Sequence, residues 1–396
     1  MPELTTRTGP PVAAPARPTL TTRAAAALRA AAPALLAYAA VRAVGLIVLG
    51  IAATAAGKSP HTLLSARWDS LWYARIATEG YGYEIHLPNG DIHSNLAFFP
   101  LLPALERAVS TVTPLTVENA GLLVSWLASL AAAWGIYATG ARVYGPRAGV
   151  ALAALWGAYP TAFVQSMAYT ETLFTALAAW AVYAVLTGRW VWAGALAALA
   201  GLTRPSAAAV VTAIWITAAV AAVRALRSGA GWRWDARMLL GLVLAPLGWL
   251  SYVLWVAVRN GGPFAYFEVQ AGWGNGFDGG WALAGFVWEN LRTNAAAGLG
   301  LIAALALVFW LLWRCVRMGL PLPVLVYAVA MVAVSLVTAG YFGSRPRVMM
   351  PAFPLLLPAA VALSKLRPAA TTALLSAAAV ASAAYGAVTL LGPGPP

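Results

Sequence analysis

The sequence predicts an all-α polytopic membrane protein of about eleven transmembrane helices, and three observations support this class. Of the 396 residues, 61% are hydrophobic. Only 9% are charged, whereas an ordinary soluble domain carries about 25%. Apolar segments of about 15 to 25 residues recur from position 31 to position 391, and such segments are typical of bilayer-spanning helices. A soluble protein is excluded, because a core of this size would need a charged surface.

The charge balance does not indicate a nucleic-acid partner. Lys and Arg number 25 against 12 Asp and Glu, which gives a net charge of +13. The basic residues form no stripe, however, and only two of them are lysines, so we expect no nucleic-acid binding. The single cysteine, Cys315, cannot form an intramolecular disulfide, and its apolar surroundings favour a packed thiol.

The sequence predicts two units along the chain, a tail and a transmembrane domain. Residues 1–30 carry arginines among Pro, Ala and Thr and predict a disordered cytoplasmic tail, and residues 31–396 predict one transmembrane domain. The break at Thr203-Arg204-Pro205 separates two short spans that could instead be one long, broken helix. The expected spans are 31–55, 119–140, 148–165, 169–187, 190–204, 205–223, 238–258, 293–313, 319–341, 347–364 and 369–391.

Charge placement predicts the orientation. With a cytoplasmic N-terminus, fifteen of the 25 basic residues lie on the cytoplasmic side, as the positive-inside rule expects. Ten of the twelve acids then lie outside, mostly in a first outer loop, 56–118, and a second outer loop, 259–292. Loops of this length usually carry function. The second loop is rich in Gly and aromatic residues, which is typical both of sugar sites and of membrane interfaces.

The segment SARWDSLWYARIATEGYGY in the first outer loop predicts a helix at the membrane interface. Its apolar positions Trp68, Leu71, Trp72 and Ile76 repeat at intervals of three and four. Asp69 lies beside this stripe between cationic neighbours, where a carboxylate can be desolvated yet stay ionised and so act as a general base. The alternative is an aspartate that caps a turn or pairs with an arginine.

The next segment, YEIHLPNGDIHSN, raises the question of a metal site. Its Glu84, His86, Asp91 and His93 are residue types that bind metals, but their spacing matches no fixed ligand pattern. Pro-Asn-Gly at its centre is a turn signal. We therefore expect a hairpin with solvated side chains and no metal. The following segment, NLAFFPLLPALERAVS at 95–110, predicts an interfacial helix with Pro103 in its first turn.

Charged residues also stand at the outer ends of apolar segments later in the chain. Arg204, Arg345 and Arg347 are suited to bidentate contact with a phosphate at the membrane surface. Snorkelling to ordinary lipid headgroups is the alternative. Glu171, in MAYTETLF, leads directly into a span, so it either faces a polar cavity or stabilises a helix start.

Several of these elements together resemble a known family, the PIG-V family of the GPI mannosyltransferase 2 type. The first match is to the family's first luminal loop, the later matches are to a Tyr-Ser/Thr-Glu-Ser/Thr-Leu-Phe element and a Thr/Ser-Arg element, and 345–354 matches more loosely. The matching residues are Arg67-Trp68-Asp69, Ile76-Ala77, Gly80-Tyr81, Tyr83-Glu84, Ala97-Phe98-Phe99-Pro100, Pro103, Tyr169-Thr170-Glu171-Thr172-Leu173-Phe174 and Thr203-Arg204.

The resemblance implies a GT-C-type glycosyltransferase, a multispan enzyme that transfers a hexose from a polyprenyl-phosphate donor on the non-cytoplasmic face. In that family the sugar is mannose, and Asp69 matches the acid expected to be the general base. This chain departs from the family in the insert between Glu84 and Ala97. The resemblance therefore does not identify the acceptor of the sugar. The candidate substrate-binding residues are Arg67, Trp68, Glu84, His93, Glu171, Arg204, Arg345 and Arg347.

We therefore expect a mannosyltransferase of the bacterial plasma membrane with its active site on the extracytoplasmic side. High Ala and Arg with almost no Lys indicates a GC-rich bacterial genome. Its partners would be the lipid-linked donor and a glycan, glycolipid or glycoprotein acceptor, with no further cofactor, since no nucleotide-binding loop is present. A lipid transporter or flippase is the main alternative, and a structural membrane subunit is a third.

Overall fold

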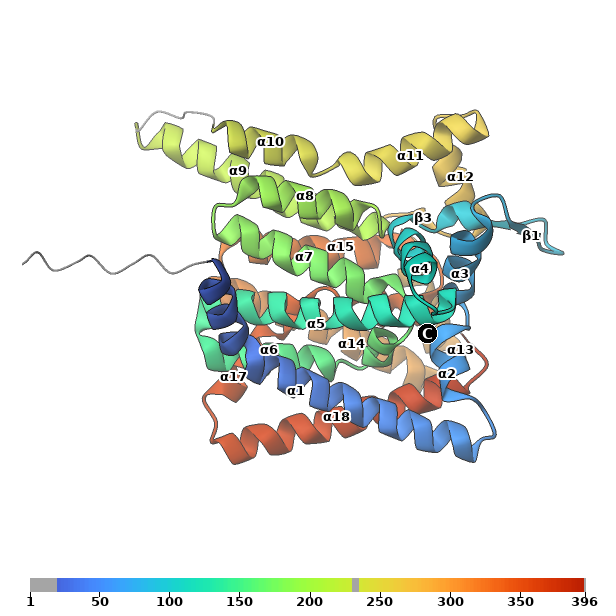
Figure 1. Ribbon diagram of the computed structural model, residues 1–396, viewed down its shortest axis with the longest axis horizontal. Coiled ribbons are helices and arrows are strands. Elements are labelled where there is room, and N and C mark those ends of the chain that lie inside the picture. The colour runs from blue at the N-terminus through green and yellow to red at the C-terminus, as the bar shows by residue number, and fades with distance from the viewer. Residues whose placement is uncertain (1–19, 230–234, 395–396) are drawn as a thin grey trace, which may run out of the picture.

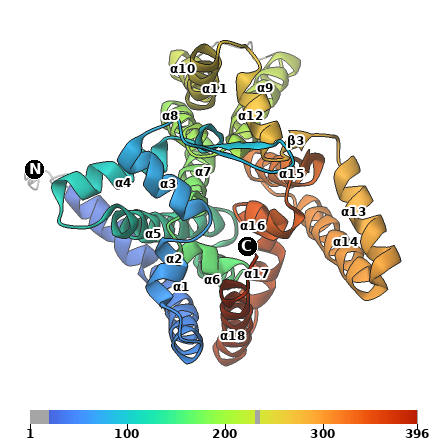
Figure 2. The ribbon, with the colours of Figure 1, turned by 90° about the vertical axis from the view of Figure 1, so that its right-hand side faces the viewer.

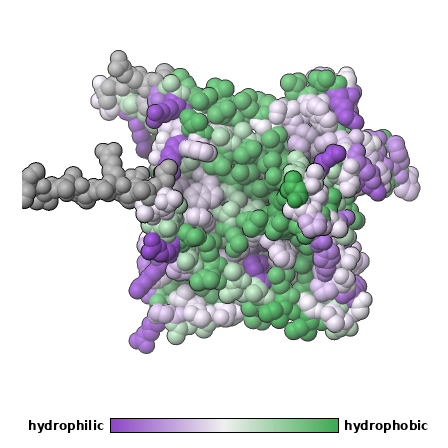
Figure 3. Space-filling view, in the orientation of Figure 1, coloured by the Kyte–Doolittle hydropathy of each residue, from purple (hydrophilic) through white to green (hydrophobic). Residues whose placement is uncertain are grey.

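The computed structural model describes residues 20–229 and 235–394 as a bundle of helices. The long helices run side by side between two ends of the bundle, and short helices and a hairpin gather at one of them, on the right in Figure 1. On the face shown in Figure 3, an apolar band lies between two polar margins. A band of this kind is the surface that a bilayer requires. The fold class expected from the sequence, an all-α polytopic membrane protein, is confirmed.

Within the described ranges, six helical segments are long and apolar enough to cross a membrane. A seventh follows if the bent pair 342–349 and 353–364 counts as one span. The six segments comprise α1 (Leu20–Ala55), α5 (Val117–Tyr144), η3 (Pro205–Ala207) with α9 (Ala208–Arg227), α10 (Ala236–Leu244) with α11 (Leu247–Asn260), α14 (Ala295–Arg317) and α18 (Pro368–Leu391).

Helical elements occupy the other expected span positions too, but they are shorter. The chain bends after α6 because Pro160 cannot continue the helix, so 148–165 is not one continuous span. The expected total of eleven transmembrane helices counts these shorter elements as spans, and it stays a prediction. The shorter helical elements are α6 (Pro146–Gly157), η2 (Ala162–Ser166), α7 (Thr170–Leu186), α8 (Trp190–Gly201), α15 (Leu322–Val337), η4 (Phe342–Ser344), α16 (Arg345–Met349), η5 (Phe353–Leu356) and α17 (Leu357–Ser364).

The short elements of both expected outer loops, together with β4, which pairs with β3 of the second loop, lie at one end of the bundle, which we call the α3 end (Figure 2). The expected hairpin is present: β1 and β2 pair antiparallel, with Gly90 in the connecting turn at φ +91°. These elements are α2 (Pro60–Ser65), α3 (Asp69–Glu79), β1 (Glu84–His86), β2 (Ile92–Ser94), η1 (Asn95–Ala97), α4 (Leu101–Val112), α12 (Ala265–Gly272), β3 (Gly276–Phe277), α13 (Trp281–Thr293) and β4 (Thr338–Ala339).

The packed centre of the bundle surrounds α7. Helix α5 packs against α6 and α7, α7 packs against α8, and α9 packs against α15. Helix α1 begins at Leu20. Residues 20–30, which were expected to belong to a disordered tail, are therefore helical, and residues 1–19 lie outside the described part of the chain. Helix α14 lies at the margin with few buried residues, and together with α13 it projects from the bundle in Figure 2.

Small residues let several helices approach closely. Gly248 of α11 faces α8, where a Cβ would collide with the carbonyl oxygen of Ala198. We expect Gly248→Ala to lower the free energy of unfolding by about 1–3 kcal/mol, because overpacking forces the two backbones apart. Thermal unfolding in detergent micelles measures this change. Gly300→Ala on α14 is the matched control, since no atom of another described residue lies within 4 Å of its Cβ position. Equal losses in both variants would contradict the assignment.

Helix α4 carries a buried acid, Glu106, which is 1% exposed and whose Oε2 has no hydrogen-bond partner in the part of the chain that the structure describes. Burial raises the pKa of this carboxyl well above its usual 4.5, and Glu118 of α5 raises the pKa further. The folded state thus holds a proton that the unfolded chain releases as the pH rises above about 4.5. Stability must therefore fall as the pH rises from that value toward the raised pKa.

The variant Glu106→Gln removes this titration while keeping the shape of the side chain. We expect its melting temperature to exceed that of the wild type increasingly as the pH rises above about 4.5, and to match it more closely at lower pH. Melting curves between acidic and alkaline pH test this. A constant difference between the two proteins at all pH values would show that Glu106 is not the titrating group.

Candidate active site

The candidate base, Asp69, is the first residue of α3 at the α3 end of the bundle. Its backbone N–H donates a hydrogen bond to Tyr169 Oη at 3.2 Å. Trp68, directly before it, has φ +52° and is the one non-glycine residue with positive φ in the described ranges. This conformation is unfavourable for a bulky side chain. The surrounding contacts therefore fix the direction in which the chain enters α3, and with it the position of Asp69.

Contacts of Arg67 help to hold this entry. Its backbone N–H donates to Ser70 Oγ at 2.8 Å, and Ser70 Oγ donates back to the Arg67 carbonyl at 2.6 Å. Its guanidinium donates to the carbonyls of Leu390 and Gly392 at the end of α18, the second at 2.6 Å. The same group lies over the Trp68 ring. Two candidate substrate-binding residues, Arg67 and Trp68, are thus occupied in placing Asp69.

Four charged residues from four parts of the chain meet at this point, and we call them the charge cluster: Asp69, Glu171, Arg204 and Arg347. Arg347 Nη1 lies 2.9 Å from Asp69 Oδ2, and Arg347 Nε lies 3.2 Å from Glu171 Oε1. Arg204 also pairs with Glu171 through Nη1 and Oε1. Two acids and two arginines give the cluster no net charge.

The cluster is buried most deeply at Glu171. Its side chain is 1% exposed, against 15% for Arg204, 11% for Arg347 and 27% for Asp69. A carboxylate in such surroundings needs cationic partners to stay ionised. Among the described residues, Oε2 of Glu171 has no hydrogen-bond partner. Asp69 is the more exposed of the two acids.

Local sequence explains why these four residues converge. Glu171 lies in the first turn of α7, where a negative charge is favoured. Arg204 directly precedes Pro205, which starts η3 and separates α8 from α9. Arg347 lies on α16, a five-residue helix after the chain turns back at the α3 end. Each side chain is therefore presented where a helix begins or breaks.

Two tyrosines, which sequence reasoning did not select as site residues, support the cluster. The guanidinium of Arg347 lies 5.1 Å from the centre of the Tyr169 ring. Tyr73 Oη and Thr170 Oγ1 lie 3.1 Å apart. Burial and the nearby Asp69 charge raise the pKa of Tyr73 above the usual 10, so its hydroxyl stays protonated. In the sequence, Tyr73 lies four positions after Asp69 and Tyr169 lies two positions before Glu171. This proximity was the signal that could have identified both tyrosines as site residues.

The remaining candidate residues lie outside the charge cluster. Arg345 donates to the Ser335 carbonyl and to Thr338 Oγ1, both at 2.7 Å, and to the Thr338 carbonyl. It therefore ties α16 to the end of α15 and does not join Arg347. Glu84 lies exposed on β1. His93 lies on β2, where its ring stacks on Trp273 with the ring centres 4.1 Å apart.

No group of three or more His, Cys, Asp or Glu side chains that could hold a metal occurs in the described ranges. The four polar residues of the 84–93 segment are divided between two strands and a turn. Catalysis without a metal stays a prediction.

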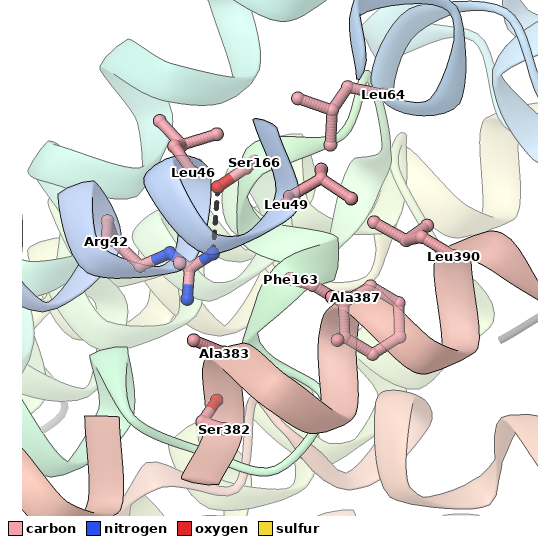
Figure 4. A pocket seen from close by; sticks show the side chains of 12 residues that line it. Arg42, Leu46, Leu49, Leu64, Phe163, Ser166, Ser382, Ala383, Ala387 and Leu390 are labelled. Atoms are coloured by element: carbon pink, nitrogen blue, oxygen red, sulfur yellow. Dashed lines mark hydrogen bonds between the residues drawn. The ribbon is translucent and has the colours of Figure 1, made fainter. Parts of the chain in front are cut away.

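One further arginine, Arg42, lies inside α1 and is 9% exposed. It donates to the Gly157 carbonyl at 3.2 Å and to Ser166 Oγ at 2.9 Å, and Figure 4 shows it beside a cavity of about 10 Å³, room for about one water. Gln165, next to Ser166, accepts from Tyr38 Oη and donates to the Trp156 carbonyl. These bonds fix η2, the segment that leads into Tyr169 and Glu171.

Comparisons with known proteins support the fold. No family model matches the chain, and no curated protein matches it in sequence. Among solved structures, ArnT from Cupriavidus metallidurans bound to undecaprenyl phosphate aligns with a TM-score of 0.52 at 15% identity. Its apo state aligns with the same score at 16% identity. The oligosaccharyltransferase of Archaeoglobus fulgidus, in complex with Zn and sulfate, aligns with a TM-score of 0.46 at 16% identity.

The ArnT alignments cover 84% of this chain and 60% of ArnT, so the chain spans about 60% of the length of that protein. At this level of identity the similarity concerns the fold. The chain shares the fold of ArnT.

The charge cluster predicts a large effect of removing Glu171. Glu171→Gln would leave Arg204 without its carboxylate partner and Arg347 with Asp69 alone, and breaking a buried pair typically costs about 3–5 kcal/mol. We expect a clear drop in melting temperature in detergent. The control is Glu289→Gln on the exposed surface of α13, which should melt like the wild type. An unchanged melting temperature for Glu171→Gln would show that the buried pairs do not hold the four elements together.

Proposed function

We propose that the protein is a glycosyltransferase that transfers a hexose, mannose by the resemblance to the PIG-V family, from a polyprenyl-phosphate donor to an acceptor of the cell envelope. The observation that carries the proposal is the charge cluster. It brings a partly exposed carboxylate and two arginines together at one end of a bundle with the GT-C fold. Both chemical needs of the transfer, a base and a group that stabilises a departing phosphate, are met by these residues.

Asp69 is the base in this mechanism. An acceptor hydroxyl must lose its proton while its oxygen attacks the anomeric carbon of the donor sugar, and the Asp69 carboxylate takes that proton. The bond between the anomeric carbon and the phosphate oxygen breaks at the same time, and its electron pair leaves with the polyprenyl phosphate. Attack from the face opposite to the leaving phosphate inverts the anomeric configuration.

Arg347 and Arg204 stabilise the departing phosphate. Guanidinium groups bind phosphate oxygens through paired N–H donors, and they act most strongly where charge develops in the transition state. In the structure both guanidiniums are paired with carboxylates. A donor phosphate therefore competes with Asp69 for Arg347, and a shift of Arg347 toward the phosphate would free the Asp69 carboxylate to take the proton.

The charge distribution supports an extracytoplasmic site in the bacterial plasma membrane. Basic residues lie in the last turns of three helices that run away from the α3 end: Arg142 of α5, Arg224 and Arg227 of α9, and Arg314 and Arg317 of α14. Under the positive-inside rule that opposite end faces the cytoplasm. The donor lipid would then present its phosphate to the charge cluster at the outer membrane surface. ArnT, solved with undecaprenyl phosphate, offers a precedent for a lipid phosphate on this fold.

Mass spectrometry of envelope glycolipids and glycoproteins from a deletion strain separates this proposal from the alternatives. The loss of one hexose from one class of molecule is the expected result and would identify that class as the acceptor. An unchanged set of glycans would instead favour the lipid transporter or the structural subunit.

Asp69→Asn keeps the shape of the side chain but removes its basicity. We expect transfer from radiolabelled polyprenyl-phosphate mannose in a membrane assay to fall by about 10²–10⁴-fold, the usual contribution of a general base. Expression and melting temperature should change little, because the amide oxygen can still accept from Arg347. The matched control is Asp235→Asn, at the start of α10. Unchanged product formation by Asp69→Asn would refute the assignment of the base.

A further inference from the structure

The two expected outer loops form one unit at the α3 end. Trp273 Nε1 donates to the Ser94 carbonyl at 3.0 Å, and Gln270 Nε2 donates to the Ala97 carbonyl at 3.1 Å. Gly272 lies so close to β2 that a Cβ there would collide with the Ile92 carbonyl oxygen. The second loop is thus fixed to the hairpin of the first loop.

Four aromatic rings meet at this contact, and we call them the ring cluster: Trp72, His93, Phe98 and Trp273. Trp72 stacks on Phe98 with ring centres 5.4 Å apart, and the Trp273 ring meets Trp72 nearly at right angles at 4.9 Å. His93 stacks on Trp273. All four side chains are half-buried, so each ring is held by its neighbours and still presents part of its surface to solvent.

The ring cluster begins next to the candidate base. Trp72 follows Asp69 by three positions on α3, and residues three apart on a helix are neighbours, with Cβ atoms about 5–6 Å apart. Tyr73, one position further, reaches Thr170 beside Glu171. A ligand on the exposed surface of Trp72 would therefore lie within reach of the Asp69 carboxylate.

This arrangement differs from that of membrane-anchoring aromatic residues. Trp281 and Trp288 of α13 are 81% and 62% exposed, as expected for rings that lie among lipid headgroups. The rings of the ring cluster pack on one another instead, and polar hairpin residues such as Glu84 and Asp91 lie exposed nearby. Rigid, partly exposed aromatic faces flanked by polar groups suit a ligand that has both apolar and hydroxyl-bearing surfaces.

We propose that the ring cluster binds the sugar ring of the acceptor, so that the acceptor of the transfer is a carbohydrate. This inference rests on the proposed function and names the class of its second substrate. The C–H groups on one face of a pyranose ring are apolar and slightly positive, and they pack against the electron-rich face of an aromatic ring. The hydroxyls at the rim of the sugar remain free, and one of them would point toward Asp69.

The surface favours a sugar over the side chain of a peptide. A serine or threonine side chain on an extended peptide has no flat apolar face that can pack against an indole ring, whereas a pyranose ring has one. The insert between Glu84 and Ala97, which departs from the PIG-V pattern, contributes His93 to the cluster. The departure from the family therefore falls on the part of the site that would select the acceptor.

The test is binding of the full-length protein, in lipid nanodiscs, to an array of immobilised glycans and serine- or threonine-containing peptides. We expect the wild type to bind glycans, and Trp273→Leu to weaken that binding by about tenfold or more through loss of ring contact. Trp273→Phe should keep most of the binding, because it keeps an aromatic face although it loses the hydrogen bond to Ser94. The matched control, Trp288→Leu, should bind like the wild type.

A second measurement on the same proteins separates failure of this inference from failure of the proposed function. Binding of undecaprenyl phosphate should be equal in the wild type and Trp273→Leu, which also shows that the variant is folded. Absence of glycan binding, binding to peptides alone, or equal glycan binding by Trp273→Leu would overturn the carbohydrate acceptor while leaving the donor site intact. Failure of the wild type to bind undecaprenyl phosphate would count against the proposed transferase itself.

Discussion

The structure of the α3 end depends on the burial of one carboxylate. Glu171 is almost fully enclosed, and its charge is compensated by Arg204 and Arg347, which arrive from distant parts of the chain. Desolvating a carboxylate is so unfavourable that these partners must be present for α7 to start where it does. The pairing therefore fixes α7, η3 and α16 relative to one another. Arg347 extends the same constraint to α3 through Asp69.

Under the proposed function, Arg347, which is shared by two carboxylates, would also allow a site with no net charge to bind an anionic lipid. A cluster of free arginines would attract every phosphate headgroup of the surrounding membrane. With two carboxylates in place, a headgroup gains little from charge alone, and a donor must supply further contacts through its sugar or its chain. Under the proposed function, selectivity for the donor would come from the competition between phosphate and carboxylate oxygens for Arg347.

The sequence predicted the fold class and much of the cluster, because the signals were local. Long apolar segments, the Pro-Asn-Gly turn and charged residues next to apolar segments are all visible in one dimension. The pairing of Arg347 with Asp69 joins residues 278 positions apart, and no local pattern distinguishes Arg347 from Arg345. They are two positions apart on a short helix, so they point in different directions, and only the packing shows that Arg345 turns to the end of α15. No local sequence pattern identified Trp273 as a site residue either, because the packing of one loop on another depends on the whole bundle.

The bonds from Arg67 to the carbonyls of Leu390 and Gly392 connect the last turn of the chain with the residue two positions before Asp69. In Figure 2 the C-terminal end lies close to α16 at the centre of the α3 end. The end of α18 thus stabilises the segment that leads into α3, although no side chain of α18 belongs to the charge cluster. Removal of the residues from Leu390 onward would delete both carbonyl acceptors and so disturb the position of Asp69.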